Sequence, residues 1–169
     1  MWKPLLFLTL MFAPPALANH VSLPAPKGEV ILTVMGGNTN KNTGISTVFD
    51  MDLLHSLGES TLSTSTVWTD GVHSYSGVSL KDFLDAMDVT DGSLEMLAVN
   101  DYMVEVPIAD AVEGGPIIAY AVDGAPMSLR DKGPLWLIYP YDSDAKYRNE
   151  EIFSRSIWQL NRINILSTP

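Results

Sequence analysis

Three apolar stretches in the middle of the chain constrain its fold most. They occupy residues 94–107, 117–127 and 133–140, and turn-forming dipeptides interrupt or bound each of them. Their apolar runs are too short for typical globular helices and are rich in Val, Ile, Tyr and Trp, which is typical of strands. Asn100-Asp101 predicts a tight turn in the first stretch, and Asp123-Gly124 predicts a hairpin turn in the second. The sequence therefore predicts a sheet core around which the other segments pack.

Two short amphipathic helices are predicted before this core. Residues 51–57 carry apolar side chains at helical spacing, and Asp50 before them is a typical N-terminal cap. Residues 80–87 repeat the pattern, with Ser79 as the cap. In the second segment Leu80, Phe83, Leu84 and Met87 form one apolar face.

Further strands and two loops complete the prediction. Residues 30–35 have the composition of a buried strand, and the alternating segment 59–69 predicts a partly exposed one. Residues 68–77 and 139–150 are aromatic and polar without a period, so we expect loops there. Residues 152–165 predict a strand, or a helix followed by a strand, that closes the domain.

The first 18 residues are expected to be a signal peptide. Lys3 precedes an apolar run at residues 5–13, and Ala16-Leu17-Ala18 matches a small-residue cleavage site. The run is shorter than the roughly 20 residues that span a bilayer. We therefore expect a periplasmic mature protein, with an extended lead-in at residues 19–28 and one domain at residues 29–169.

Composition excludes several functions. The chain contains no cysteine, which excludes disulfides, thiolate metal sites and cysteine nucleophiles. Its net charge of -10 disfavours binding to nucleic acid or to an anionic membrane surface. Six of its ten Lys and Arg residues nevertheless lie in the last 40 positions, an arrangement that favours an anionic ligand or partner at that end.

Aromatic residues gather on the two predicted loops and just beyond the second one. A flat heterocycle could stack between such rings, with an arginine at its polar edge. Packing alone remains an alternative, because Trp and Tyr are also common in cores. No hydrolase or metalloprotease motif is present. The residues are Trp68, His73, Tyr75, Tyr139, Tyr141, Tyr147 and Trp158, with Arg148 and Arg155 beside them.

Five segments, taken in order, resemble the molybdopterin-binding domain of the sulfite oxidase family. They are Tyr75–Leu84, Asn100–Pro107, Ala119–Met127, Gly133–Pro140 and Ser156–Ile163, and the resemblance covers roughly residues 45–166. It implies an α+β fold in which mixed and antiparallel sheets with short helices surround a pterin cleft.

One departure from that family bears on function. Its enzymes bind molybdenum through a cysteine about a dozen residues before the glycine that matches Gly77, whereas Ser63–Trp68 stands here. Hydroxyl groups are poor substitutes for a soft thiolate. We therefore do not expect oxidoreductase activity or bound molybdenum, and a molybdenum enzyme that uses another ligand, such as Ser65, remains an alternative.

The chain resembles more closely the small, cysteine-free periplasmic pterin-binding regulators of this fold. The resemblance lies in Thr64-x-Thr66-x-Trp68 and in Arg155-x-x-Trp158-Gln-Leu. It implies a protein that binds a reduced pterin and regulates a membrane-bound cyclic di-GMP signalling protein through that protein's periplasmic domain. A periplasmic adaptor that has lost every ligand is a second alternative.

The resemblance also implies roles for individual residues. Trp68 would stack on the pterin, and Tyr102 and Trp158 would line the cleft. Arg148 and Arg155 would hold the ligand's polar edge, whereas Arg162 is expected on a solvated strand face. By loop position and chemistry alone, His73 and Tyr75 would complete the mouth of the site, and Tyr147 is a further predicted ligand-binding residue.

Overall fold

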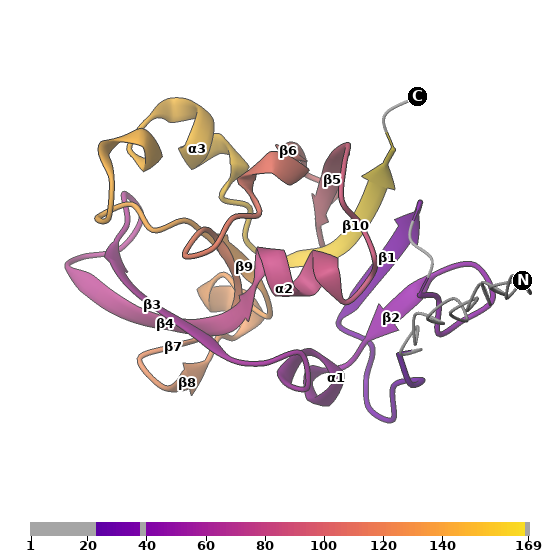
Figure 1. Ribbon diagram of the computed structural model, residues 1–169. Coiled ribbons are helices and arrows are strands. Elements are labelled where there is room, and N and C mark those ends of the chain that lie inside the picture. Colours follow the sequence, from indigo (N-terminus) through magenta and orange to yellow (C-terminus); the bar gives the residue numbers. More distant parts are fainter. Residues whose placement is uncertain (1–22, 38–39, 168–169) are drawn as a thin grey trace, which may run out of the picture.

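The computed structural model describes residues 23–37 and 40–167 (Figure 1). The predicted signal peptide at residues 1–18 lies outside the described residues, as do residues 19–22 of the predicted lead-in. Residues 23–28, which complete that lead-in, form neither helix nor strand. No helix of the described residues is long and apolar enough to cross a membrane.

The first sheet contains both ends of the described domain. Its β1 and β10 pair in parallel, and its other neighbours are antiparallel. The predicted Asn100-Asp101 turn joins β5 to β6, and Asp101 adopts the left-handed backbone with a φ of 63°. Across the sheet the order is β2 (Thr47–Phe49), β1 (Leu32–Gly36), β10 (Leu160–Leu166), β5 (Ser93–Ala98) and β6 (Met103–Pro107).

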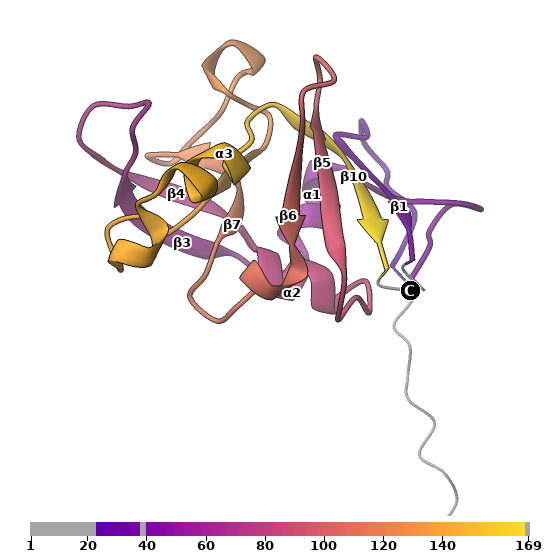
Figure 2. The same ribbon diagram turned by 90° about the horizontal axis from the view of Figure 1, so that it is seen from above.

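The second sheet is antiparallel throughout. Its hairpin between β7 and β8 turns at Asp123 and Gly124, whose φ angles of 50° and 78° confirm the predicted turn. The order is β3 (Ser60–Ser65), β4 (Val72–Ser79), β7 (Ile117–Val122) and β8 (Ala125–Pro126), and β9 (Trp136–Ile138) also pairs with β7. Figure 2 shows the two sheets side by side, with β3, β4 and β7 on one side and β6, β5, β10 and β1 on the other.

Both predicted helices form with their predicted caps. Helix α1 (Met51–His55) begins after Asp50, whose Oδ1 accepts a hydrogen bond from the Leu53 amide at 2.8 Å. Helix α2 (Leu80–Asp85) begins after Ser79, whose hydroxyl accepts from the Asp82 amide at 2.9 Å. Each helix ends two residues before its predicted end, since single turns of this length are held mainly by packing.

The predicted closing segment is a helix followed by a strand. Helix α3 (Glu150–Arg155) leads through an extended linker into β10. The predicted long loop before it contains only the 3₁₀ turn η3 (Ala145–Tyr147). Two more 3₁₀ turns are η1 (Ile108–Asp110) after β6 and η2 (Leu129–Asp131) after β8.

The prediction of a loop at residues 68–77 is wrong for most of these residues. Residues 72–79 form β4, which lies between β3 and β7. Ser, Gly and His are weak strand formers, and here the pairing on both sides overrides that propensity. Gly77 is needed at the bulge against β7, because a Cβ there would lie 2.2 Å from the Ile118 carbonyl oxygen.

The core lies between the apolar faces of the sheets and the short helices. Met96 of β5, Val78 of β4 and Ile118 of β7 are fully buried. Helix α2 adds Phe83, whose ring packs on Phe49 with centroids 5.2 Å apart. Apolar residues of the central stretches therefore form much of the interior, as predicted. The cavity described below lies at one end of the sheets, where loops meet.

Candidate functional site

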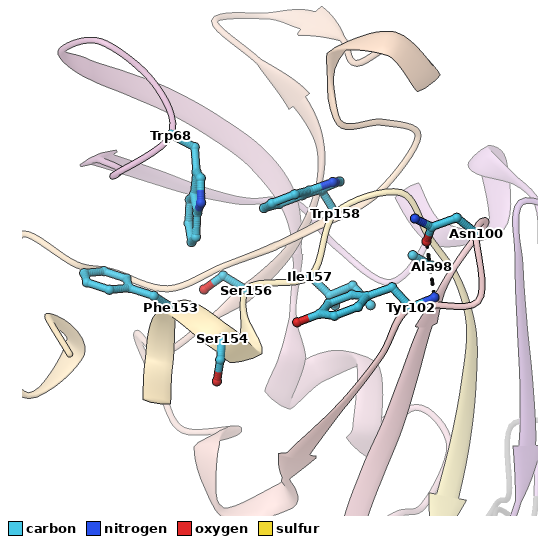
Figure 3. A pocket seen from close by; sticks show the side chains of 9 residues that line it. All are labelled: Trp68, Ala98, Asn100, Tyr102, Phe153, Ser154, Ser156, Ile157 and Trp158. Atoms are coloured by element: carbon cyan, nitrogen blue, oxygen red, sulfur yellow. Dashed lines mark hydrogen bonds between the residues drawn. The ribbon is translucent and has the colours of Figure 1, made fainter. Parts of the chain in front are cut away.

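A cavity of about 480 Å³ opens where β5, β6, the turn after β3 and the segment after α3 meet (Figure 3). Its volume is in the range of small-molecule binding sites. No charged side chain is among the residues that line it. They are Trp68, Ala98, Asn100, Tyr102, Phe153, Ser154, Ser156, Ile157 and Trp158.

Aromatic rings form the walls of this cavity. The ring of Trp68 lies edge-on to Trp158 and Phe153, with centroids 5.6 Å and 6.0 Å away. Tyr102 comes from the β5–β6 hairpin and lies across from Trp68 (Figure 3). Trp158 is 38% exposed and Tyr102 is 55% exposed, so ring surfaces remain accessible to a ligand at the mouth.

Backbone pairing with β9 fixes Trp158. Trp158 forms a bridge with Trp136, and the Leu137 amide donates to the Ile157 carbonyl at 2.9 Å. The indole Nε1 of Trp136 donates to the Ser156 carbonyl at 3.1 Å. The segment after α3 therefore runs along β9 as a short extended stretch, and this holds Trp158 at the mouth of the cavity.

A compact turn after β3 positions Trp68. The Trp68 amide donates to the Thr66 hydroxyl at 3.1 Å, and the hydroxyls of Thr66 and Thr69 lie 2.8 Å apart. These bonds are the local turn chemistry of Thr side chains. The ring also contacts the buried Trp136, with centroids 5.9 Å apart, so one edge of Trp68 belongs to the core and the rest faces the cavity.

The polar groups of the cavity are mostly engaged with the protein. The Ser156 hydroxyl donates to the Ile152 carbonyl and accepts from the Tyr141 hydroxyl, and burial raises the pKa of Tyr141 to about 12. The Ser154 hydroxyl donates to the Glu151 carbonyl. Asn100 accepts the Tyr102 amide at its Oδ1, and its NH₂ group bonds no described residue. Asn100 therefore offers a donor to a ligand at the rim.

The structure brings together three of the eight predicted site residues. Trp68, Tyr102 and Trp158 line one cavity although they are far apart in the sequence. Tyr147 packs on Tyr139 instead, with centroids 6.1 Å apart. The structure therefore contains a cavity lined by aromatic rings, but only three of the eight predicted residues line it.

The two predicted arginines bond to neighbouring protein groups outside this lining. Arg148 donates to the Tyr141 carbonyl at 2.8 Å and to Asp142 at 2.7 Å. Arg155 pairs with Asp110 at 3.0 Å and with Glu151. Arg162, predicted to be solvated, is 38% exposed at its side chain and pairs with Asp101.

His73 and Tyr75 line a separate cavity of about 290 Å³. The His73 Nδ1 lies 2.6 Å from Asp123 Oδ2, and this hydrogen bond raises the pKa of His73 and lowers that of Asp123. Tyr75 is fully buried, and burial raises the pKa of its hydroxyl. Arg130 and Lys132 also line this second cavity.

Sequence reasoning missed six lining residues of the first cavity. Phe153 is an aromatic residue two positions before the predicted site residue Arg155, so its position carried a usable signal. The other five missed residues carry no such signal in the sequence. They line the cavity only because β5, β6 and α3 begin or end beside it. These are Ala98, Asn100, Ser154 and Ser156, together with the buried Ile157.

The segment that stands in place of the enzymes' cysteine does not suit molybdenum. The Ser65 hydroxyl donates to Asp142 Oδ1 at 2.8 Å, and its amide donates to Asp142 Oδ2 at 2.6 Å. Asp142 is also paired with Arg148. A hydroxyl engaged in this way is a hard, neutral donor, unlike the soft thiolate that the family resemblance implies for the enzymes' metal. Within the described residues, no cluster of three or more His, Asp or Glu could hold a metal ion.

The two sheets with a few short helices form an α+β protein, and the comparison with solved structures bears out the predicted sulfite oxidase-type molybdopterin-binding fold. The chain is similar to the sulfane dehydrogenase SoxCD from Paracoccus pantotrophus, with a TM-score of 0.58 and 16% sequence identity. The match covers 81% of this chain and 38% of that one. At this identity the likeness shows the fold alone. No family model and no curated protein matches the sequence.

Proposed function

We propose that the protein is a periplasmic pterin-binding protein that senses a reduced pterin and regulates a membrane-bound cyclic di-GMP signalling protein through its periplasmic domain. The observation that carries the ligand part is the cavity whose walls include Trp68, Phe153 and Trp158. A pterin is a flat, polar heterocycle, so it combines ring faces for stacking with edge groups for hydrogen bonds.

In this proposal the three predicted residues that share the cavity contact the ligand directly. Trp68 and Trp158 offer ring surfaces, and Tyr102 covers the ligand from the β5–β6 hairpin. Asn100 supplies a hydrogen-bond donor at the ligand's edge. Arg148 and Arg155 act indirectly, because their bonds to Asp142 and Asp110 hold the loop and helix that surround the site.

A binding role is favoured over molybdenum catalysis by the donor set at Ser65. Neither its hydroxyl nor the neighbouring Asp142 supplies the soft ligand that this fold's enzymes use. The signalling part of the proposal and the periplasmic location rest on the resemblance of the Thr64–Trp68 and Arg155–Leu160 segments to the cysteine-free regulators.

The test is to purify the protein from the periplasm and look for a released ligand. We expect a fluorescent pterin after acid release and oxidation, and we expect its loss in Trp68→Ala. Elemental analysis of the same preparation separates the alternatives, since about one molybdenum per chain would favour the oxidoreductase. A folded protein without measurable affinity for any pterin would leave the ligand-free adaptor instead.

A further inference from the structure

An exposed apolar surface surrounds the mouth of the cavity. Val99 is 46% exposed, Tyr102 55%, Leu129 52% and Trp158 38%, and these are four of the twelve large apolar side chains that the described residues expose most. They come from the β5–β6 turn, the η2 turn and the linker before β10. We call this set the rim. Figure 2 shows the β5–β6 turn and the orange segment that contains η2 at the same end of the molecule.

Gln159 ties the three segments of the rim together. Its carbonyl accepts from the Val99 amide at 3.0 Å, and its own amide donates to the Lys132 carbonyl at 3.0 Å. Its side-chain Nε2 donates to the Leu129 carbonyl at 2.7 Å. Gln159 also has a φ of 53°, a conformation that non-glycine residues adopt only when their surroundings hold it. The three segments of the rim are therefore joined through Gln159. Trp158, which lines the cavity, is the residue before Gln159 in the chain.

Two cations, Arg130 and Lys132, lie beside the rim on the segment that contains η2 and leads to β9. Arg130 and Lys132 make no ion pair within the described part of the chain, and Lys132 lies 5.5 Å from the centroid of the Trp136 ring. The nearby carboxylates have other partners: Asp131 accepts from the Ser128 hydroxyl, and Asp101 pairs with Arg162. In a chain of net charge -10, two such cations beside an apolar surface fit an acidic partner.

We infer that the rim is the docking surface for the signalling partner, and that this partner presents apolar side chains flanked by carboxylates. The inference rests on the proposed function for the identity of the partner. Apolar contacts would cover Val99, Leu129 and the exposed edges of Tyr102 and Trp158, while Arg130 and Lys132 meet the acidic groups. Exposed apolar patches bordered by charge are typical of protein-binding sites.

Docking at this surface couples partner and ligand. The partner would close the mouth of the cavity over a ligand that lies against Trp158, whose neighbour Gln159 joins the segments of the rim. The coupling must be reciprocal, so a docked partner is expected to raise the ligand affinity by the same factor by which the ligand raises the partner's affinity.

Site-specific photo-crosslinking of the full-length protein in living cells tests the surface. A photoreactive phenylalanine derivative replaces Leu129 or Val99, neither of which lines the cavity, and the controls are the exposed positions Val112 and Ile45. We expect both rim positions to yield the same adduct, identified by mass spectrometry as a membrane protein with a periplasmic domain, and the controls to yield none. No adduct from the rim, or equal adducts from the controls, would overturn the proposed surface.

Charge reversal provides a matched control. Arg130→Glu with Lys132→Glu should reduce the adduct about tenfold. Lys41→Glu with Lys146→Glu changes the net charge equally and should leave the adduct unchanged. Equal reductions would mean that only overall charge matters and would contradict the surface. An adduct with a soluble periplasmic protein would overturn the partner class.

Pterin affinity of the purified variants separates this inference from the proposed function. The variants substituted at Val99 or Leu129, and the variant Arg130→Glu with Lys132→Glu, should bind a tetrahydropterin as the wild type does, because none of these residues lines the cavity. A wild-type protein that binds no pterin would remove the proposed ligand, while the crosslinking pattern would still decide where the partner docks.

Discussion

The Nη1 atom of Arg155 lies 3.0 Å from Oδ2 of Asp110, and this ion pair ties the end of helix α3 to the turn η1. Only 17% and 18% of the two side chains are exposed. The Tyr139 hydroxyl donates to the same carboxylate oxygen at 2.7 Å, and its pKa is raised by burial and by this hydrogen bond. Arg155 thus belongs to a largely buried polar network beside the cavity.

We therefore predict that Arg155→Ala affects stability more than ligand affinity. Asp110 would lose its cation, which should lower the free energy of unfolding by about 1.5–3 kcal/mol, the range for a hydrogen bond to a charged group. Pterin affinity should change less than about threefold, because Arg155 does not line the cavity. Urea unfolding and pterin titration of the same variant measure both quantities.

Arg162→Ala is the control for that experiment. Arg162 also pairs with one aspartate, but the two side chains are 38% and 78% exposed, so its loss should cost roughly 0–1 kcal/mol. Weakened pterin binding with unchanged stability in Arg155→Ala would instead place Arg155 at the ligand.

A second prediction concerns the exposed wall of the cavity. Trp158→Ala should weaken pterin binding about fivefold to seventyfold, since one aromatic stacking contact contributes roughly 1–2.5 kcal/mol. Tyr147→Ala is the control, because this predicted site residue packs on Tyr139 outside the cavity. Fluorescence titration with a tetrahydropterin distinguishes the two. Equal losses would show that the ligand lies elsewhere.

The pH dependence of stability should report the His73–Asp123 pair. The raised pKa of His73 stabilises the fold below its ordinary value of 6.5, and this contribution is lost as the pH rises through the raised pKa. The lowered pKa of Asp123 stabilises the fold above 3.8, and that contribution is lost as the pH falls through the lowered pKa. The pair therefore contributes its full stabilisation to the fold only between about pH 3.8 and pH 6.5, the ordinary pKa values of the two groups.

The stability difference between wild type and His73→Gln should accordingly be larger at about pH 5.5 than at about pH 9, as measured by urea unfolding. In Asp123→Asn, the pKa of His73 should fall toward 6.5, which NMR titration of the imidazole protons can follow. An unchanged His73 titration in that variant would contradict the assigned cause.

The fourth prediction tests the contact between β4 and β7. In Gly77→Ala the new Cβ would lie 2.2 Å from the Ile118 carbonyl oxygen, so the strands must separate. We expect a loss of about 3 kcal/mol or more in the free energy of unfolding. Gly44→Ala is the matched control, because nothing lies within 4 Å of its Cβ position. Similar stabilities of the two variants would argue against this strand pairing.

The sequence by itself determined the local features of the fold. The turns at Asn100-Asp101 and Asp123-Gly124 and the caps Asp50 and Ser79 follow from the backbone preferences and side-chain hydrogen bonds of a few adjacent residues. Such interactions do not depend on distant parts of the chain, so pattern reasoning found them. The resemblance to a known family supplied the overall fold, and three of its implied site residues share one cavity.

Only the tertiary structure decided the long-range pairings and their consequences. Strand β4 exists because β3 and β7 flank it, although its own composition indicates a loop. Trp158 reaches the cavity through its bridge to Trp136, and Arg155 bonds Asp110, 45 positions away in the sequence, rather than lining the cavity. A charged side chain pairs with whichever carboxylate the fold brings near, and a cavity wall consists of whatever residues lie where elements end. The spacing of neighbouring residues in the sequence predicts neither the partner of a charged side chain nor the lining of a cavity.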